Sequence, residues 1–70
     1  MVDALARART MVRDLARARE AAGMTQAHVA GRIGTTQSAV ARLERAEADP
    51  SLSTLVKYAS VVGLRVSIVR

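Results

Sequence analysis

Apolar residues recur every three or four positions along most of this 70-residue chain, which is the spacing of one helix face. The first such stretch runs from Val2 to Ala22 without glycine or proline, and it is rich in the good helix formers Ala, Arg, Leu and Glu. Gly23 is the expected C-cap of this long first helix. Its inward face is predicted to contain Leu5, Ala8, Val12, Leu15 and Ala22.

A short second helix is predicted after Gly23. Thr25 is a good N-cap, and the helix runs through Ile33 to a stop at Gly34. Val29, Ala30 and Ile33 are its expected inward residues.

The third helix follows after only a few residues, capped by Thr35 or Thr36 and running to about Arg45. So short a link forces a sharp angle between the second and third helices. The sequence Asp49-Pro50-Ser51 then breaks the helix, because proline disfavours helical backbone at the residue before it. Ser51 can cap a fourth helix over residues 52–62.

After Gly63, the expected stop of the fourth helix, the hydrophobic period changes from about 3.6 to about 2. Leu64, Val66 and Ile68 alternate with polar residues, which predicts one strand over residues 64–69. A lone strand leaves backbone groups unpaired, and a copy from a second subunit would pair them across a two-fold axis; the alternative is a frayed tail. The predicted fold class is all-α, with four to five helices and a short C-terminal β-strand that pairs across a dimer.

Composition fits one small domain over residues 1–70, near the lower size limit for a fold without a partner. The net charge is +5, and every cationic side chain except Lys57 is an arginine. Such a balance suits an anionic partner, most commonly nucleic acid, although a solvated basic surface is the alternative.

Several classes of function are disfavoured by what the chain contains. It has no cysteine, one histidine and no carboxylate pair or nucleophile-base spacing, so we expect no enzyme, cofactor, metal site or small-molecule substrate. It has no apolar run typical of a signal peptide or a membrane span, and the basic first helix lacks the Trp or Phe of a membrane-surface helix. We therefore expect a soluble, cytoplasmic protein without a membrane partner.

The third helix has two unlike sides. Ala39, Val40 and Leu43 are expected to pack inward. The outward arc carries amide, hydroxyl, methyl and guanidinium groups and no acid: Gln37, Ser38, Ala41, Arg42 and Arg45. Gln suits adenine, Arg suits guanine, Ser is tolerant and an Ala methyl can meet the thymine methyl. The first four of these residues are predicted to read base edges.

The first turns of the second and third helices are predicted to hold phosphates, because their unpaired backbone N–H groups and positive dipole ends suit anionic oxygens. Such contacts position a protein on DNA without reading its sequence. The predicted phosphate contacts are Thr25, Gln26, Thr35, Thr36 and, at the end of the third helix, Arg45.

These motifs resemble the lambda-repressor-like helix-turn-helix family, of the Cro or XRE type. The matching runs are Met24-Thr25-Gln26-Ala27-His28-Val29-Ala30, Ile33-Gly34-Thr35-Thr36-Gln37-Ser38-Ala39-Val40, Leu43-Glu44 and Pro50-Ser51-Leu52 with Leu55. The resemblance covers about residues 12–63, with the helix-turn-helix at 25–45 and an N-terminal helical extension over 1–11. It implies a bacterial or phage transcriptional repressor, associated with the nucleoid, that binds a palindromic operator in double-stranded DNA as a homodimer.

The resemblance also implies roles for single residues. Gln26 braces a phosphate and the first recognition residue, and Gln37, Ser38 and Arg42 face the bases. Arg19 and Glu44 form a structural ion pair. Independently of the family, Arg19 falls on the apolar face of the first helix, where a charge needs a partner unless its head reaches water.

Two positions depart from the family's pattern. Ala46 stands where many members have glycine after the recognition helix, so that helix either runs on or ends in a different loop. His28 replaces the acid of a capping box and cannot make the same reciprocal bond when neutral. We expect an exposed histidine without a structural role; a phosphate contact is the alternative.

The end of the chain resembles the small HigA-like or HipB-like antitoxins, which repress their own operon and bind a toxin. The alternatives are a stand-alone phage-type or restriction-control regulator without a toxin, and a protein-interaction module that has lost DNA binding. Arg9, Arg13 and Arg17 form a single-sign ladder on the first helix that suits an acidic toxin surface, the DNA backbone or solvent. The sequence leaves this choice, and any partner of residues 1–8, open.

Overall fold

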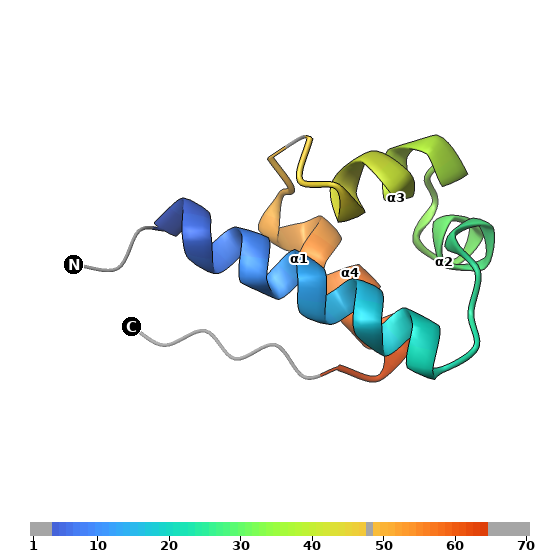
Figure 1. Cartoon of the computed structure of the whole chain (residues 1–70). Helices are drawn as coiled ribbons and strands as arrows, with labels where there is room; N and C mark the ends of the chain where they lie inside the picture. The colour runs from blue at the N-terminus through green and yellow to red at the C-terminus, as the bar shows by residue number, and fades with distance from the viewer. Residues whose placement is uncertain (1–3, 48, 65–70) are drawn as a thin grey trace.

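The computed structural model describes residues 4–47 and 49–64, and their side chains from residue 9 onward. This part of the chain is all-helical, as predicted (Figure 1). Its helices are α1 (Ala4–Ala21), α2 (Gln26–Ile33), α3 (Gln37–Glu44) and α4 (Leu52–Val62). Leu64 follows α4 without strand structure, and the rest of the strand predicted over 64–69 lies outside the described residues.

The starts of α2, α3 and α4 are fixed by hydroxyl N-caps. Thr25, Thr36 and Ser51 each have extended backbone. Their side-chain oxygens accept the backbone N–H three residues later at 3.0, 3.1 and 3.1 Å respectively. The sequence left Thr35 and Thr36 as alternatives for α3, and Thr36 is the cap.

The end of α3 settles the question raised by Ala46. Ala46 has a φ of +57°, the left-handed conformation that the glycines after the other helices adopt. The Ala46 N–H donates to the Leu43 carbonyl and the Glu47 N–H to the Arg42 carbonyl, both at 3.0 Å. These two bonds are those of a Schellman C-cap. Helix α3 therefore does not run on, and an alanine occupies a position that favours glycine.

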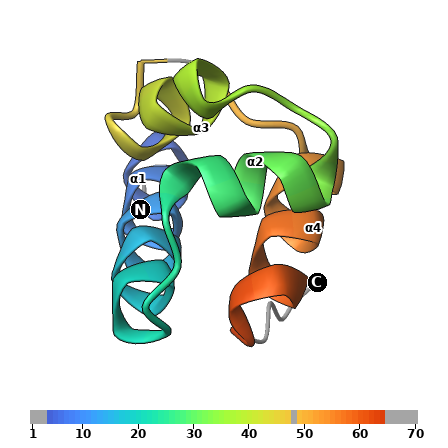
Figure 2. The same ribbon diagram turned by 90° about the vertical axis from the view of Figure 1, so that its right-hand side faces the viewer.

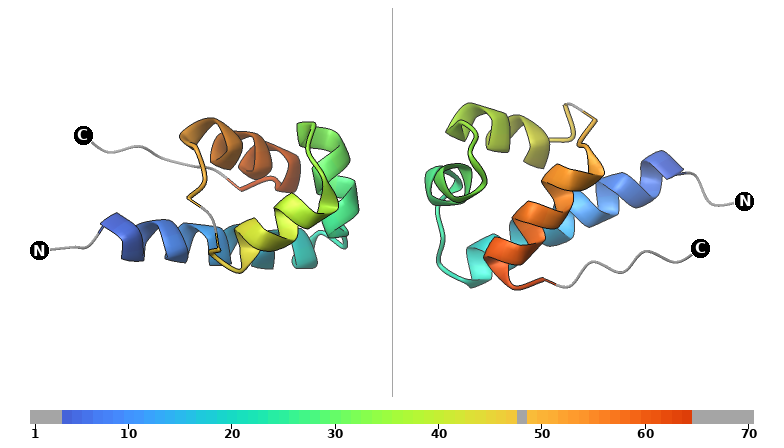
Figure 3. Two further views of the ribbon diagram at one scale, coloured as in Figure 1. Left: turned by 90° about the horizontal axis from the view of Figure 1, so that it is seen from above. Right: turned by 180° about the vertical axis from the view of Figure 1, so that it is seen from behind.

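The four helices pack around one aliphatic core. Figure 2 shows α1 and α4 on either side of α2, with α3 above them. Seen from above, α3 crosses over α1, and from behind α4 crosses α1 (Figure 3). Each helix contributes apolar side chains, whose removal from water is the main driving force for this packing. The buried residues are Val12, Leu15, Val29, Ala30, Val40, Leu43, Leu55, Tyr58 and Ala59.

Two residues predicted to face inward are exposed instead. Ala22 lies beyond the end of α1, in the turn where the helical face no longer continues. Ala39 lines an open surface groove beside Thr35 and Thr54, because its methyl group is too short to reach the core from the first turn of α3. The side chains predicted at positions 5 and 8 of the inward face lie outside the described part of the chain.

Candidate nucleic-acid interface

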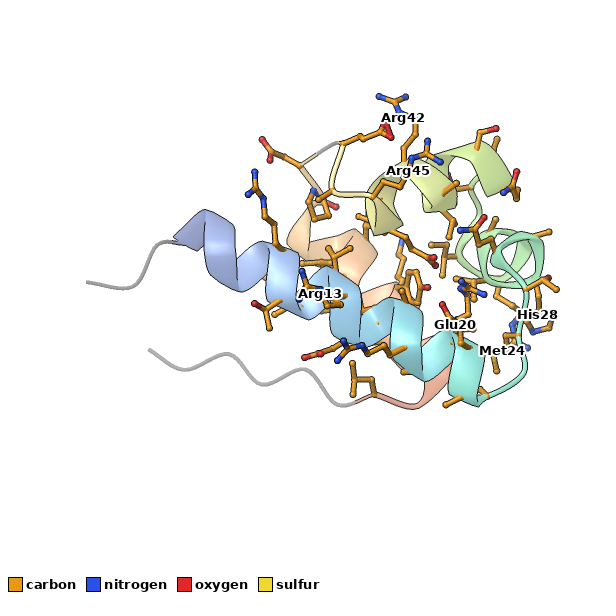
Figure 4. All side chains as sticks on the ribbon, in the orientation of Figure 1. Arg13, Glu20, Met24, His28, Arg42 and Arg45 are labelled. Carbon is orange, nitrogen blue, oxygen red and sulfur yellow. The ribbon has the colours of Figure 1, made fainter. Side chains whose placement is uncertain are left out.

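The outer side of α3 is free of contacts with the core. Val40 and Leu43 anchor the helix from below, with only 1% and 6% of their surface exposed. On the opposite arc Gln37, Ser38 and Arg42 are exposed, and Ala41 is half-buried. Figure 4 shows Arg42 projecting from α3 on the side away from α1. The four residues predicted to read bases thus share one helix and border one open surface.

The structure joins the first residues of α2 and α3. Nε2 of Gln37 donates to Oε1 of Gln26 at 2.7 Å. The amide nitrogen of Gln37 has a second hydrogen and its oxygen two lone pairs, so this bond leaves it one donor and an unused acceptor. A bidentate contact to adenine N7 and N6 needs one of each. Gln26 therefore holds Gln37 without using up the groups that such a contact requires.

Gln26 is itself held from below. Its Nε2 donates to Oε1 of Glu44, the last residue of α3, at 3.0 Å. Gln26 thus connects the two ends of α3 through side-chain hydrogen bonds. This contact with Glu44 was not expected from the sequence.

The carboxylate of Glu44 pairs with Arg19 of α1. Nε of Arg19 lies 2.8 Å from Oε2 and Nη2 lies 3.0 Å from Oε1, a bidentate arrangement. Nη1 of Arg19 donates to the Met24 carbonyl at 2.9 Å. The side chains of Arg19 and Glu44 are only 12% and 9% exposed, so little water competes for the pair. The structure thus brings together the two residues expected to form the ion pair.

Sequence reasoning missed Tyr58 as a partner of this carboxylate. Tyr58 is fully buried in the core, and its hydroxyl donates to Oε2 of Glu44. The available signal was that a buried tyrosine hydroxyl needs a hydrogen-bond partner, and Tyr58 is the only aromatic residue in an aliphatic core. The sequence alone gave no indication of which polar group that partner would be.

These contacts shift the titration of the groups involved. Burial alone would raise the pKa of Glu44, but hydrogen bonds from Arg19, Tyr58 and Gln26 outweigh it and hold that pKa below its usual value. The hydrogen bond to Glu44 raises the pKa of Arg19 against the opposing effect of burial. Burial, and then the bond to Glu44, raise the pKa of Tyr58 far above its usual value. The ion pair is therefore charged, and Tyr58 neutral, throughout the neutral pH range.

The helix-turn-helix family model HTH_3 matches residues 15–69, which is more than half of the chain. The chain belongs to this helix-turn-helix family. The family consists of DNA-binding transcription regulators, and the chain is accordingly a DNA-binding domain of that kind. No curated protein and no solved structure matches the chain.

In a helix-turn-helix protein the second helix of the motif enters the major groove while the first crosses the backbone. Here α2 is the first helix of the motif and α3 is the second. The predicted phosphate contacts Thr25, Thr35 and Thr36 are exposed at the starts of these two helices, and Gln26 is half-buried beside them. Arg45 is exposed after α3, where its Nε donates to Glu47.

Three further observations concern His28, potential metal ligands and the hydropathy of the helices. His28 is exposed, as expected, and its backbone N–H serves the Thr25 cap. Among the described residues no three potential metal-ligating side chains gather in one place. None of the described helices has the length and hydropathy needed to cross a membrane.

Proposed function

We propose that the chain binds a palindromic operator as a homodimer and represses transcription there, with Gln37, Ser38, Ala41 and Arg42 reading the base edges. The observation that carries this proposal is the 2.7 Å bond from Gln37 to Gln26. It orders the first residue of the arc before DNA arrives, which lowers the entropic cost of binding. A helix face kept only for solubility needs no such brace.

The phosphate backbone is held at both ends of α3. Thr25, Gln26, Thr35 and Thr36 border the major groove at the starts of α2 and α3, and Arg45 borders it at the far end. Each threonine can donate its hydroxyl hydrogen to a phosphate even where its oxygen already caps a helix, because a hydroxyl both donates and accepts. These residues supply affinity for DNA of any sequence, and the base-reading residues supply the preference for the operator sequence.

The dimer is proposed to form through residues 64–69, with Leu64, Val66 and Ile68 of each subunit on one face of a paired strand. The support is the alternation of apolar and polar residues in this segment. A two-fold axis places the recognition helices in half-sites one helical turn apart, or about 34 Å. The operator is then palindromic because the protein is symmetric.

We further propose that this regulator is the antitoxin of a toxin-antitoxin pair. The support is the similarity of its C-terminal segment to that of small antitoxins. A stand-alone regulator is the competing assignment. A short adjoining reading frame that encodes a protein forming a stable complex with this chain supports the antitoxin, and its absence supports the stand-alone regulator.

A comparison of two duplexes tests the DNA-reading role. Dissociation constants are measured at one salt concentration for the promoter region of the gene and for a scrambled duplex of equal composition. Wild type is expected to prefer the promoter, and Gln37→Ala/Arg42→Ala to bind both duplexes with equal affinity. Ser53→Ala, at an exposed position on α4, serves as the matched surface change and is expected to keep the preference. Equal binding of both duplexes by wild type would contradict the proposal.

A further inference from the structure

A second basic surface lies between α1 and the end of α3. Arg9, Arg13 and Arg17 of α1 line a groove whose other wall carries Arg45. We call these four residues the arginine groove. We propose that the arginine groove binds the phosphate backbone of duplex DNA next to the site where α3 enters the major groove. This inference rests on the proposed DNA-binding function and extends it to a surface outside the helix-turn-helix.

The charges of the arginine groove are available to a ligand. Within the described residues no acidic side chain lies within ion-pair distance of Arg9, Arg13 or Arg17, and all three are exposed. Arg45 pairs with Glu47, but both side chains are about half exposed, at 61% and 49%. An exposed pair of this kind contributes little and is readily exchanged for a phosphate.

The acids at one end of the groove do not cancel this charge. Glu44 lines it, but its carboxylate already accepts hydrogen bonds from Arg19, Gln26 and Tyr58. Glu20 is exposed and lies 3.7 Å from Arg19. Both acids therefore face a cation that is not part of the arginine groove.

The chemistry of the lining favours nucleic acid over a protein. Stable protein interfaces are centred on aromatic or large apolar side chains that fill pockets. The remaining lining of this groove offers Ala16, Ala46 and the fully packed Val12, which is only 3% exposed. Arginines without an apolar anchor suit phosphate oxygens, which guanidinium groups bind through paired hydrogen bonds.

The position of the groove continues the path of DNA past α3. Its lining includes Glu44, the last residue of α3, and Ala46, which lies two residues further along the chain. Figure 1 shows the N-terminal half of α1 extending beyond that end of α3. From Arg9 to Arg17 the helix rises about 12 Å, which matches about three to four nucleotides of one strand at 3.4 Å each along the duplex axis. A strand flanking the recognition site would thus run along the ladder.

The arginine groove also lies partly outside the matched family region. The family match begins at Leu15, so Arg9 and Arg13 precede it. The additional contact is accordingly a property of this chain's extended first helix.

The salt dependence of binding tests the proposal, because each phosphate contact contributes about 0.9 to the slope of log K against log salt. Arg13→Ala/Arg17→Ala is compared with Arg32→Ala/Lys57→Ala, which also removes two exposed cations but from the groove between α2 and α4. The first pair is expected to lower the slope by about 1.8 relative to wild type, equally on the promoter and the scrambled duplex, with the promoter preference retained. The control pair is expected to change the slope by much less, and Arg13→Lys/Arg17→Lys to keep it.

The outcomes separate this inference from the proposed function. A reduced slope together with no promoter preference in wild type supports the arginine groove and contradicts sequence-specific reading. A slope that Arg13→Ala/Arg17→Ala changes no more than the control pair overturns the groove as a DNA contact and points to an acidic protein surface or solvent. Thermal melts of each variant establish that the proteins compared are folded.

Discussion

The hydroxyl of Tyr58 donates a hydrogen bond to Oε2 of Glu44, which joins the only aromatic residue of the core to the carboxylate that also binds Arg19 and Gln26. Gln26 in turn accepts from Gln37, the first residue of the recognition helix. A continuous set of hydrogen bonds therefore runs from the core of the domain to its proposed base-reading surface. The stability of the fold and the orientation of Gln37 depend on the same carboxylate.

Tyr58→Phe removes one donor to Glu44 and keeps the packing of the ring. A hydrogen bond to a charged group contributes about 1.5–3 kcal/mol, and Arg19 and Gln26 continue to serve the carboxylate. We expect the free energy of unfolding, measured by urea denaturation, to fall by about 1–2 kcal/mol. An unchanged midpoint and slope would show that this hydroxyl contributes nothing to stability.

The pH dependence of stability follows from the two shifted pKa values. The pKa of Glu44 is lower in the folded protein than the ordinary 4.5, so its contribution is present above that pH and is lost as pH falls through the folded value. The pKa of Tyr58 is higher than the ordinary 10.0, so its contribution is present below that pH and is lost as pH rises toward the folded value. Thermal melts from acid to alkaline pH should show both losses, and Tyr58→Phe should weaken the alkaline one.

Ala46→Gly is expected to stabilise the protein. The left-handed backbone at this position, with φ of +57°, costs an alanine about 1–2 kcal/mol, which glycine would relieve. The greater conformational freedom of glycine in the unfolded chain offsets about 0.4–1 kcal/mol of that stabilisation. A net increase of about 0.5–1 kcal/mol in the free energy of unfolding is expected. Ala27→Gly, at an exposed position inside α2, is the matched control and should destabilise by about 1 kcal/mol. Loss of stability in both variants would contradict the role given to Ala46.

Gln26→Ala is expected to weaken promoter preference although Gln26 is not assigned to a base. The change removes the partner that holds Gln37, whose amide then loses its fixed orientation. Promoter and scrambled-duplex affinities of Gln26→Ala, Gln37→Ala and the double variant form a thermodynamic cycle. Coupled residues in one network typically show about 0.5–3 kcal/mol of interaction energy, and we expect a value within that range. Strict additivity would mean that Gln26 and Gln37 contribute independently.

The helices were predictable because residues close to each helix end determine where the helix begins and stops. Thr25 and Ser51 cap α2 and α4 with their own side chains, and Gly34 and Gly63 end these helices in left-handed turns, so each signal lies within a few residues of the boundary. Whether the third helix ends before Ala46 could not be predicted in this way. Two backbone hydrogen bonds close the turn around the left-handed Ala46, and the preference of glycine for that conformation does not indicate whether an alanine there forms them.

The site was predictable to a lesser extent. The exposed arc of α3 follows from helical period, and the proximity of Arg19 and Glu44 was expected from family resemblance together with the position of a charge on an apolar face. The contacts of Glu44 with Gln26 and Tyr58 join residues 18 and 14 positions apart in the chain. Such contacts arise from the angles at which the helices pack, and periodicity within one helix carries no information about them.

Selection of duplexes from a random pool tests the central claim, that α3 reads a palindromic sequence, most directly. Wild type is predicted to enrich a palindrome whose half-sites lie about one helical turn apart. Arg42→Ala is predicted to enrich the same palindrome with preference lost at one position in each half-site. Recovery of no common sequence by wild type, or of an identical one by Arg42→Ala, would contradict the account.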